Sequence, residues 1–471
     1  MLDDPHSHMR VGRRGQSRAG ANETAANQPN ESFRAEALHR IVVVGGGAAG
    51  LELVTRIGDR LGRRRRASVT LVDSARTHLW KPLLHEVAAG SIDPGEYEVN
   101  YLAQAHWHGF RYRFGEMIGI DRPAKQVRLG ATIDDEGREI TPPRSVGYDT
   151  LVIAIGSVTN DFGTQGVAEY AVPLETPAQA RRFNRRLVNA CIRAQTQDGP
   201  VRPGQLHVAI VGAGATGAEL AAELRRTMRE VVAYGLDRID PERDIRIVLI
   251  EAAERILPAL PERISEAVRR LLDGLGIEVH TNARVTNVTA DGLRLADGSF
   301  VPSELVVWAA GVKAPEVLRH VDGLEVNRIN QLVVERTLQT TRDPDIFAIG
   351  DCAACPRQGE PTPVPPRAQA AHQEAAHMVR QIERRLRGEP LLPYSYRDFG
   401  SLVSLGKHST VGNLMGLLFG RGFFIEGLVA GVMYRSLRML HERALHGTRR
   451  AVLGLLARGL SPRTGPPVKL H

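Results

Sequence analysis

The sequence has few cysteines and no long apolar segment. Its 471 residues include only three cysteines, too few for a disulfide framework, which favours a reducing compartment. No stretch approaches the roughly 18 consecutive apolar residues that a membrane-spanning helix requires. The N-terminal segment is polar and lacks the apolar core of a secretory signal. We therefore expect residues 1–38 to form a disordered extension ahead of a globular protein.

The cysteines also provide no complete metal site. Cys352 and Cys355 form a C-x-x-C pair, but no second pair of ligands accompanies it, so a zinc site would be incomplete. The pair directly follows Asp351, where we expect a helix to begin, and both thiols would pack there. We predict no metal site and keep a redox use of the pair as the alternative.

Positive charge is concentrated at the C-terminal end of the chain. Residues 401–471 contain ten Lys or Arg and two acids, so their balance of 10 − 2 = +8 equals the formal net charge of the whole protein. The same segment has an apolar stripe at helical spacing, bordered by arginines: Ile425, Leu428, Val429, Val432, Met433, Leu437, Leu440 and Leu445. A basic helix with an apolar face suits an anionic membrane surface better than nucleic acid. We expect residues 401–471 to associate with a membrane, with core docking or a homodimer contact as the alternatives.

Two glycine-rich motifs dominate the rest of the sequence. Each follows a β-branched run and leads into an alanine- and leucine-rich stretch of helical character: Gly45-x-Gly47-x-x-Gly50 and Gly212-x-Gly214-x-x-Gly217. In a strand–turn–helix unit such glycines let the backbone approach a pyrophosphate at the helix N-terminus. The pair predicts an α/β protein with two Rossmann-like dinucleotide-binding domains, followed by the C-terminal amphipathic segment.

An acidic residue closes the strand that follows each motif. Asp73 ends the first of these runs, and Glu251 ends the second. An acid at this position accepts hydrogen bonds from the adenosine ribose of a dinucleotide, and its charge disfavours a 2′-phosphate. The second motif therefore favours NADH over NADPH, although Arg255 would partly offset the repulsion. The first motif is left for FAD.

The flavin domain is predicted to be interrupted by the nicotinamide domain. After the second motif the chain returns to an apolar strand that ends in Gly350 and Asp351. A carboxylate there can accept from a ribityl hydroxyl beside the pyrophosphate, with a simple helix N-cap as the plainer alternative. We predict a split FAD-binding domain and an inserted NADH-binding domain: 39–160 with 330–400, and 161–329.

Three further polar residues are candidates for chemistry. Flavin and nicotinamide bound on adjacent units are placed for hydride transfer. Glu219 lies on the first turns of the second motif's helix, where its carboxylate would face the junction between the two cofactors; a surface glutamate is the alternative. Gln369 and Gln373 stand one helical turn apart, with His372 beside Gln369. Their amides would donate to a quinone carbonyl or form ordinary polar helix surface.

Longer segments resemble a known family. They are IVVVGGGAAGLE, HLWKPLLHEVAAGSID, YDTLVIAIGS, AIVGAGATGAELAAEL, VLIEAAERILPALP, VVWAAG, NRINQLVVERTLQTTRDPDIFAIGDC and PPRAQAAHQ. Together they are similar to segments of the type II NADH:quinone oxidoreductases, the single-subunit, non-proton-pumping respiratory dehydrogenases, and most of all to the enterobacterial branch. The resemblance covers residues 39–471.

The resemblance implies cofactors, an acceptor and site residues. FAD is the bound group, NADH the donor, a membrane quinone the acceptor, and the C-terminal helices a monotopic anchor at the cytoplasmic face of the inner (plasma) membrane. The residues assigned to FAD are Gly45, Gly47, Gly50, Asp73, Lys81, Pro82 and Asp351. Those assigned to NADH are Gly212, Gly214, Gly217, Glu251, Ala310 and Gly311. The residues that match positions near the quinone are Glu219, Gln369 and Gln373.

Three other interpretations share parts of this pattern. A sulfide:quinone oxidoreductase has the same scaffold but needs separated cysteines flanking the flavin, which one C-x-x-C pair and Cys191 fit poorly. A soluble ferredoxin-type reductase would not need the basic, apolar tail. A non-catalytic NAD(H)-sensing flavoprotein would bind both dinucleotides yet turn over slowly with every acceptor.

Overall fold

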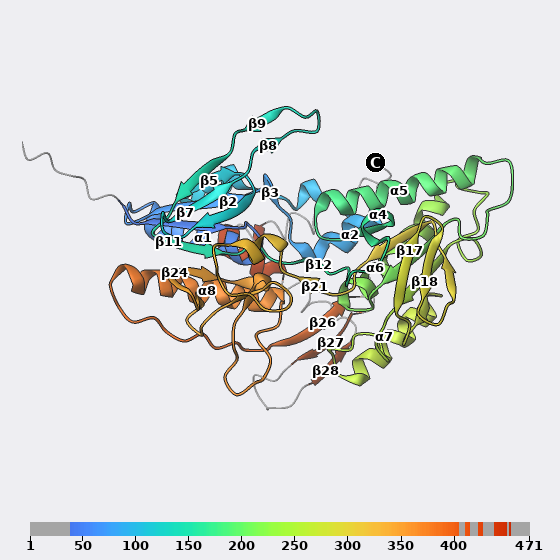
Figure 1. The fold of residues 1–471 in the computed structure, drawn as a ribbon. Coiled ribbons are helices and arrows are strands. Elements are labelled where there is room, and N and C mark those ends of the chain that lie inside the picture. The colour runs from blue at the N-terminus through green and yellow to red at the C-terminus, as the bar shows by residue number, and fades with distance from the viewer. Residues whose placement is uncertain (1–37, 405–409, 415–422, 427–437, 450–451, 454–471) are drawn as a thin grey trace, which may run out of the picture. The chain divides into compact units, whose positions relative to one another are not determined.

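The structure, a computed structural model, describes residues 38–404, 410–414, 423–426, 438–449 and 452–453 (Figure 1). For residues 401–426 it describes the backbone alone. Apart from Leu38, the extension predicted at residues 1–38 lies outside the described residues.

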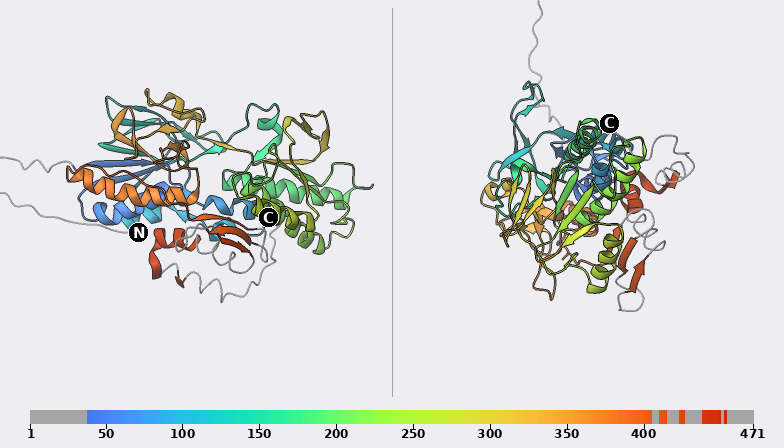
Figure 2. Two further views of the ribbon diagram at one scale, coloured as in Figure 1. Left: turned by 90° about the horizontal axis from the view of Figure 1, so that it is seen from below. Right: turned by 90° about the vertical axis from the view of Figure 1, so that its right-hand side faces the viewer.

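The first of two parallel sheets has six strands in the order β23-β24-β11-β1-β2-β5. Its strands are β1 (Arg40–Val44), β2 (Ser68–Asp73), β5 (Arg111–Phe114), β11 (Thr150–Ile153), β24 (Asp343–Ala348) and the antiparallel edge strand β23 (Gln339–Thr340). β1 and β11 are almost wholly buried, as their continuous apolar runs predict for central parallel strands. Helices α1 (Ala48–Ile57) and α8 (Ala368–Leu386) lie side by side on this part of the molecule (Figure 2).

The second sheet has five parallel strands in the order β13-β20-β14-β15-β16. They are β13 (Ala171–Pro173), β14 (His207–Val211), β15 (Arg246–Ile250), β16 (Glu278–His280) and β20 (Leu305–Trp308). The helices that accompany this sheet are α5 (Pro177–Thr196), α6 (Ala215–Ala233) and α7 (Glu262–Gly274). In both sheets the strand before the glycine motif is central, with the strand order changing direction beside it. That is the topological switch point at which open α/β sheets bind ligands.

Small antiparallel sheets complete the two units. One consists of β6 (Met117–Asp121), β7 (Gln126–Leu129) and β10 (Arg144–Gly147), and another of β17 (Val285–Thr289), β18 (Gly292–Leu295) and β19 (Phe300–Pro302). The two connections between the units pair with each other, because β12 (Val158–Thr159) is antiparallel to β21 (Val312–Lys313).

Packing assigns two segments differently from the sequence prediction. Residues 314–324 were expected in the second domain, but Ala314 and Leu318 are buried in the core of the first sheet. Residues 79–89 were expected in the first domain, yet Leu83 and Ala88 are buried with α5 and α6 in the second core. Neither segment has a long periodic pattern, so contacts remote in the sequence decide which core buries it. The second segment includes α2 (Leu84–Ala89) and brings flavin-domain sequence against the second motif's helix.

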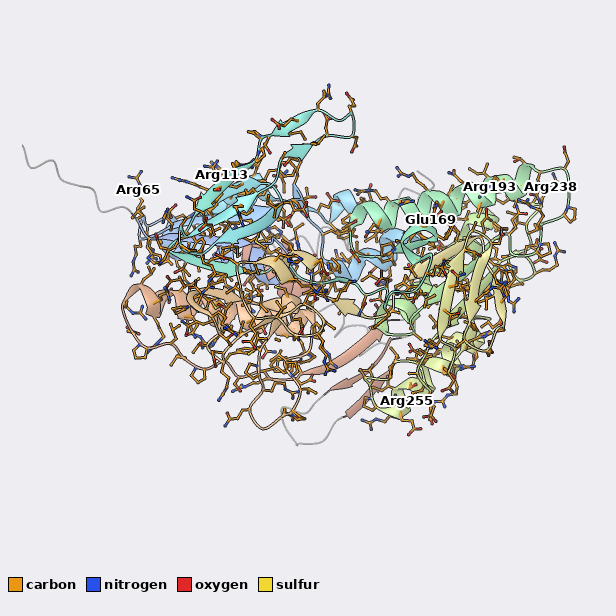
Figure 3. The ribbon with its side chains drawn as sticks, in the orientation of Figure 1. Arg65, Arg113, Glu169, Arg193, Arg238 and Arg255 are labelled. Carbon is orange, nitrogen blue, oxygen red and sulfur yellow. The ribbon has the colours of Figure 1, made fainter. Side chains whose placement is uncertain are left out.

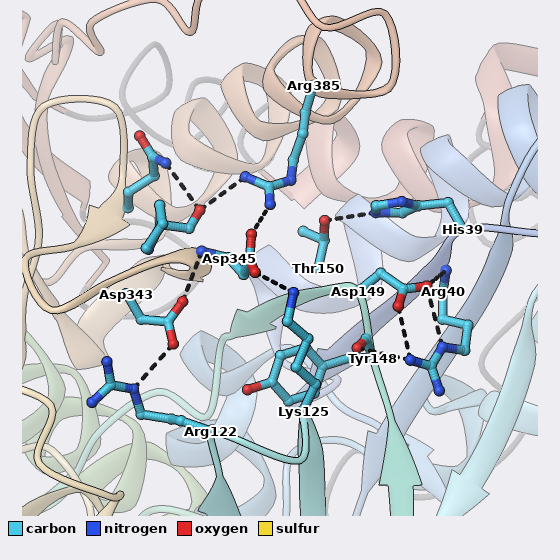
Figure 4. A network of polar contacts seen from close by, with 12 residues as sticks. His39, Arg40, Arg122, Lys125, Tyr148, Asp149, Thr150, Asp343, Asp345 and Arg385 are labelled. Carbon is cyan, nitrogen blue, oxygen red and sulfur yellow. Dashed lines mark hydrogen bonds and ion pairs between the residues drawn. The ribbon is translucent and has the colours of Figure 1, made fainter.

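An ionic network joins the first sheet at the strand ends opposite the glycine turn (Figure 4). Arg40 pairs with Asp149 at 2.8 Å, and Arg122 pairs with Asp343 at 3.0 Å. Asp345 contacts both Lys125 and Arg385. Arg40 begins β1, Asp149 directly precedes β11 and Asp343 begins β24, so the network ties the starts of these strands together.

The C-terminal region departs from the continuous helical stripe expected from its sequence. Residues 400–404, 410–414 and 423–426 form the three strands of an antiparallel sheet: β26 (Gly400–Ser404), β27 (Thr410–Leu414) and β28 (Phe423–Glu426). Ile425, the expected start of the helical stripe, therefore lies in a strand, because pairing with β27 overrides local spacing. Residues 428–437 of the stripe lie outside the described residues.

A helix over residues 438–449 is described, and its two stripe residues differ in exposure. Leu440 is 45% exposed, whereas Leu445 is buried in the first core and its carbonyl accepts a 2.8 Å bond from Gln104. The same helix stacks His441 on Trp80. This face of the helix docks on the protein, which was the alternative interpretation of the stripe.

Candidate active site

The two glycine motifs adopt the same backbone geometry. Gly45 and Gly212 have φ values of +101° and +100°, which only glycine adopts readily. A methyl group on Gly50 would lie 1.8 Å from the Gly45 carbonyl oxygen, and one on Gly217 would lie 2.0 Å from that of Gly212. The first glycine thus makes the turn, and the third lets the helix pack against it.

The middle glycine of each motif borders open space. No atom lies within 4 Å of a methyl group placed on Gly47 or Gly214. Each of these residues is the N-cap of its helix, α1 or α6, and neither helix has a side-chain cap. Free N–H groups and the positive end of the helix dipole therefore face a cradle that a side chain would fill. This geometry fits the pyrophosphate of a dinucleotide at each motif.

The acids after the motifs are held in matching ways. Asp73 accepts hydrogen bonds from the amides of Gly46 and Ala75 at 2.5 and 2.6 Å. Glu251 accepts from the amides of Ala213 and Ala253 at 2.8 and 3.0 Å. Burial raises the pKa of Asp73, and the two amide bonds oppose that rise. Each carboxylate oxygen keeps a second lone pair, so both acids can still accept from a ribose diol.

Arg255 does not pair with Glu251. It lies beside α7 (Figure 3) and donates to the carbonyls of Leu257 and Pro258 at 3.3 and 2.9 Å. Arg255 can therefore offset the negative charge of Glu251 only through space and not by direct contact.

A chain of contacts joins the other predicted flavin residues. Lys81, in the short helix η2 (Lys81–Leu83) together with Pro82, donates to the carbonyl of Ser157 at 2.8 Å. The Ser157 hydroxyl donates to Asp351 at 2.7 Å. The tertiary structure thus brings the loop after β2, the end of β11 and the turn after β24 to one place.

Glu374 supports the same turn and was not singled out from the sequence. It is 2% exposed, lies on α8, and accepts a 2.5 Å bond from the amide of Gly350. Burial raises its pKa to about 8, and the charge of Asp351 adds to the rise. The feature of the sequence that could have identified Glu374 is its position on the apolar face of an amphipathic helix.

Glu219 is buried against residues 79–89, which pack in the second core. Its carboxylate lies 3.6 Å from Nδ1 of His85, and both residues are 6% exposed. Burial lowers the pKa of His85 to about 4, so its imidazole is neutral near pH 7. The contact therefore joins a carboxylate to a neutral imidazole and is not an ion pair.

Ala310 and Gly311 follow β20 beside the second glycine turn. The Cα atom of Ala310 lies 2.7 Å from a methyl group placed on Gly212, so the two backbones are in close contact. Gly311 has a φ of +62°, and its carbonyl accepts from Asn160 at 3.3 Å. This places the pair where the two connections between the units meet.

The two predicted quinone residues use their amides to hold the segment before β26. Gln369 donates to Asp398 and to the Gly400 carbonyl at 3.0 and 3.1 Å, and it accepts from Phe399 at 3.1 Å. Gln373 donates to the carbonyl of Arg397 at 2.8 Å and accepts from its amide at 3.0 Å. Both donors of Gln369 are occupied, whereas Gln373 makes one donor bond among the described residues.

The cysteines are buried thiols. Cys352 and Cys355 are 0% and 1% exposed, and burial raises the pKa of each to about 12. Among the described residues, no group of three or more His, Cys, Asp or Glu is arranged to hold a metal ion. Nor does any helix in the described part of the chain have the length and apolarity to cross a membrane.

Two Rossmann sheets, each with a glycine turn and an acid held by backbone amides, are the architecture of a two-dinucleotide oxidoreductase. The sequence pattern of the pyridine nucleotide-disulphide oxidoreductase family matches residues 39–375, and the chain belongs to that family. The predicted fold class is confirmed.

Relatives narrow this class. The chain is 42% identical over 446 residues to the type II NADH:quinone oxidoreductase of Haemophilus influenzae, covering 92% of this chain and 100% of that one. It is 29% identical over 437 residues to NdhA, a type II NADH:quinone oxidoreductase of Mycobacterium tuberculosis, and the match covers 90% of this chain and 87% of NdhA. The fold resembles that of NDH2 from Plasmodium falciparum in complex with NADH, with a TM-score of 0.76 and 18% sequence identity. The match covers 92% of this chain and 100% of that one. This protein is a member of the type II NADH:quinone oxidoreductases, as its motifs predicted.

Proposed function

We propose that the protein oxidises NADH through bound FAD and reduces a membrane quinone without pumping protons. The observation that carries this proposal is the repeated geometry of the two glycine turns, each with an open cradle at an uncapped helix and an amide-held acid. Membership of the family supports the donor, the flavin and the acceptor.

The first motif would hold FAD. Gly45, Gly47 and Gly50 would cradle its pyrophosphate, and Asp73 would accept from its adenosine ribose. The remaining contacts would come from the chain of hydrogen-bonded residues around the turn after β24: Lys81 and Pro82 near the isoalloxazine and Asp351 at the ribityl chain. When bound, the flavin supplies hydride acceptance and electron transfer to quinone.

The second motif would hold NADH. Gly212, Gly214 and Gly217 would cradle the pyrophosphate, and Glu251 would bind the ribose diol and repel a 2′-phosphate. Ala310 and Gly311 would border the nicotinamide. Since Arg255 is engaged elsewhere, the geometry favours NADH over NADPH.

The acceptor would bind at the N-terminal turns of α8. Gln373 has donor capacity for a quinone carbonyl, and Gln369 would set the position of residues 397–400 beside it. Glu219, buried between α6 and the segment 79–89, would carry protons or steer charge near the flavin.

The C-terminal region would bring this site to a membrane. We propose peripheral association of residues 401–471 with the anionic cytoplasmic face of the inner (plasma) membrane, through exposed apolar and basic side chains such as Leu440, Leu453 and Arg443. A homodimer contact through the same surface is the alternative. Membrane association should depend on added vesicles, whereas dimerisation should depend on protein concentration.

Stopped-flow absorbance would test the quinone site. In a Gln369→Ala, Gln373→Ala double variant, NADH should bleach the flavin at the normal rate, while reoxidation by a soluble quinone should slow about 10-fold or more, the loss expected for hydrogen bonds made to the substrate. Asp398→Ala is the matched control, because it removes a contact of Gln369 but keeps both amides. Normal reoxidation in the double variant would refute the assignment, and equal slowing in Asp398→Ala would show that residues 397–400 do the binding.

Steady-state assays would separate the alternatives. NADH oxidation should depend on added quinone, and sulfide should fail as a donor. Slow turnover with every acceptor would support a sensing protein instead.

A further inference from the structure

A buried glutamate holds a histidine between the two quinone-site glutamines. Glu52, on α1, is 1% exposed, and its Oε2 lies 2.6 Å from Nδ1 of His372 on α8. The two helices lie side by side, α1 in blue and α8 in orange (Figure 2). His372 is thereby fixed on the helical turn that also carries Gln369 and Gln373.

The carboxylate determines how this imidazole can react. An acceptor at Nδ1 places a proton there and leaves Nε2 as the outward nitrogen. The side chain of His372 is 38% exposed, whereas that of Glu52 is 1% exposed. One side of the imidazole is therefore fixed inside the protein, and the other can exchange protons with water.

Other charged and titratable groups lie around the pair. On α1, Arg56 contacts Glu52 Oε1 at 2.7 Å. On helix 438–449, His441 lies near His372, but burial holds its pKa well below the ordinary value, so it is neutral. His441 in turn contacts His78 at 3.0 Å, and burial lowers the pKa of His78 to about 4.

The reaction needs a proton from the protein. The overall change is NADH + H⁺ + quinone to NAD⁺ + quinol, so one proton is required beyond the hydride that leaves NADH. Glu219 holds the place after the second motif that Glu52 holds after the first, and it contacts His85, but both residues are only 6% exposed. His372 is therefore more open to water than this pair.

We propose that His372, positioned by Glu52, is the catalytic acid that gives a proton to the quinone. This inference rests on the proposed quinone site. In the step, the Nε2–H bond of the imidazolium breaks as an O–H bond forms on the quinone that has received two electrons. Water then reprotonates His372 from its exposed side.

Stopped-flow kinetics against pH would test the step. His372→Gln should slow reoxidation by quinone about 100-fold, the lower range for general acid catalysis, and leave bleaching by NADH unchanged. In the unaltered protein reoxidation should slow as pH rises, as expected when an imidazolium is the acid. Glu52→Gln should move that decline to lower pH and slow the reaction about 10-fold near neutral pH, because the imidazolium loses its counter-charge.

A second readout does not depend on turnover. In FAD-loaded protein labelled with ¹⁵N-histidine, the signal missing from His372→Gln identifies His372, and its pKa should fall in Glu52→Gln. Asp59→Asn is the matched control, since Arg63, Asp59 and His108 form a similar triad just beyond the end of α1. That variant should change neither the kinetics nor the His372 signal.

The possible failures are distinguishable. If His372→Gln reoxidises normally while the double glutamine variant is slow, the quinone site stands and the proton donor is not His372. If both reoxidise normally, the quinone binds elsewhere and both assignments fall. An unchanged His372 pKa in Glu52→Gln would overturn the positioning role of Glu52.

Discussion

The hydroxyl of Ser157 donates a 2.7 Å hydrogen bond to the carboxylate of Asp351. Ser157 follows β11 and Asp351 follows β24, so the bond joins the ends of two paired parallel strands. The carbonyl of Ser157 also accepts from Lys81. A residue without an assigned role in the sequence thus positions two predicted flavin contacts.

Ser157→Ala should weaken FAD binding without unfolding the domain. The variant removes the hydroxyl that donates to the Asp351 carboxylate but keeps the carbonyl contact to Lys81. A hydrogen bond to a charged group contributes about 1.5–3 kcal/mol, so FAD should dissociate about 10-fold more readily. Release of flavin fluorescence on dilution measures this. Thr196→Val, which removes a hydroxyl from the exposed end of α5, is the control. If Ser157→Ala retained FAD as well as the unaltered protein, the role of Ser157 in FAD binding would be contradicted.

Gly217→Ala and Gly214→Ala should have different effects. The methyl group of Gly217→Ala would meet the Gly212 carbonyl at 2.0 Å, so this variant should unfold at a lower temperature. Gly214→Ala meets no protein atom and should keep the unfolding temperature, but it fills the cradle and should weaken NADH binding. Calorimetry and NADH titration separate the two results. Normal NADH affinity in Gly214→Ala would argue against a pyrophosphate at that turn.

Glu251→Ala should shift the dinucleotide preference toward NADPH. The change removes the charge that opposes a 2′-phosphate and leaves the amides of Ala213 and Ala253 unpaired. The kcat/KM for NADH should fall about 10-fold, and the ratio of NADPH to NADH use should rise. Glu254→Ala, which alters a nearby exposed acid, should leave the ratio unchanged.

Glu374→Gln should flatten part of the pH dependence of stability. The pKa of Glu374 is about 8 in the folded protein against an ordinary value of 4.5, so the folded state binds more protons between these values. Its contribution is complete below about pH 4.5 and is lost as pH rises through about 8. Glutamine keeps an oxygen for the Gly350 amide and does not ionise. The free energy of unfolding of the variant, measured with urea, should therefore rise relative to that of the unaltered protein between pH 5 and pH 8. Parallel pH profiles of the two proteins would exclude an ionising Glu374.

The thiols should be unreactive in the native protein. Cys191, Cys352 and Cys355 are each at most 1% exposed, and burial raises the pKa of each to about 12. A thiol reagent should label none of them before unfolding and all of them after it. Rapid labelling or a native disulfide would revive a redox role for the C-x-x-C pair.

Local sequence was sufficient wherever the determining contacts are close in the chain. The glycine turns followed from Gly45 and Gly212, because a strand, a left-handed turn and a helix N-terminus lie within a few residues. Contacts between distant segments were not predictable in this way. The burial of Leu83 in the second core, the bond from Ser157 to Asp351 and the pairing of Glu52 with His372 each depend on which helices pack together.

The sequence by itself determined the class of this protein, since two complete glycine motifs and their acids specify two dinucleotide sites through short-range backbone geometry. Only the tertiary structure decided how the polar groups are used. It engaged the amides of Gln369 and Gln373 with residues 397–400, buried Leu445, and left His372 exposed beside a buried Glu52. The physical reason is that burial and hydrogen-bond partners depend on the packing of segments far apart in the chain.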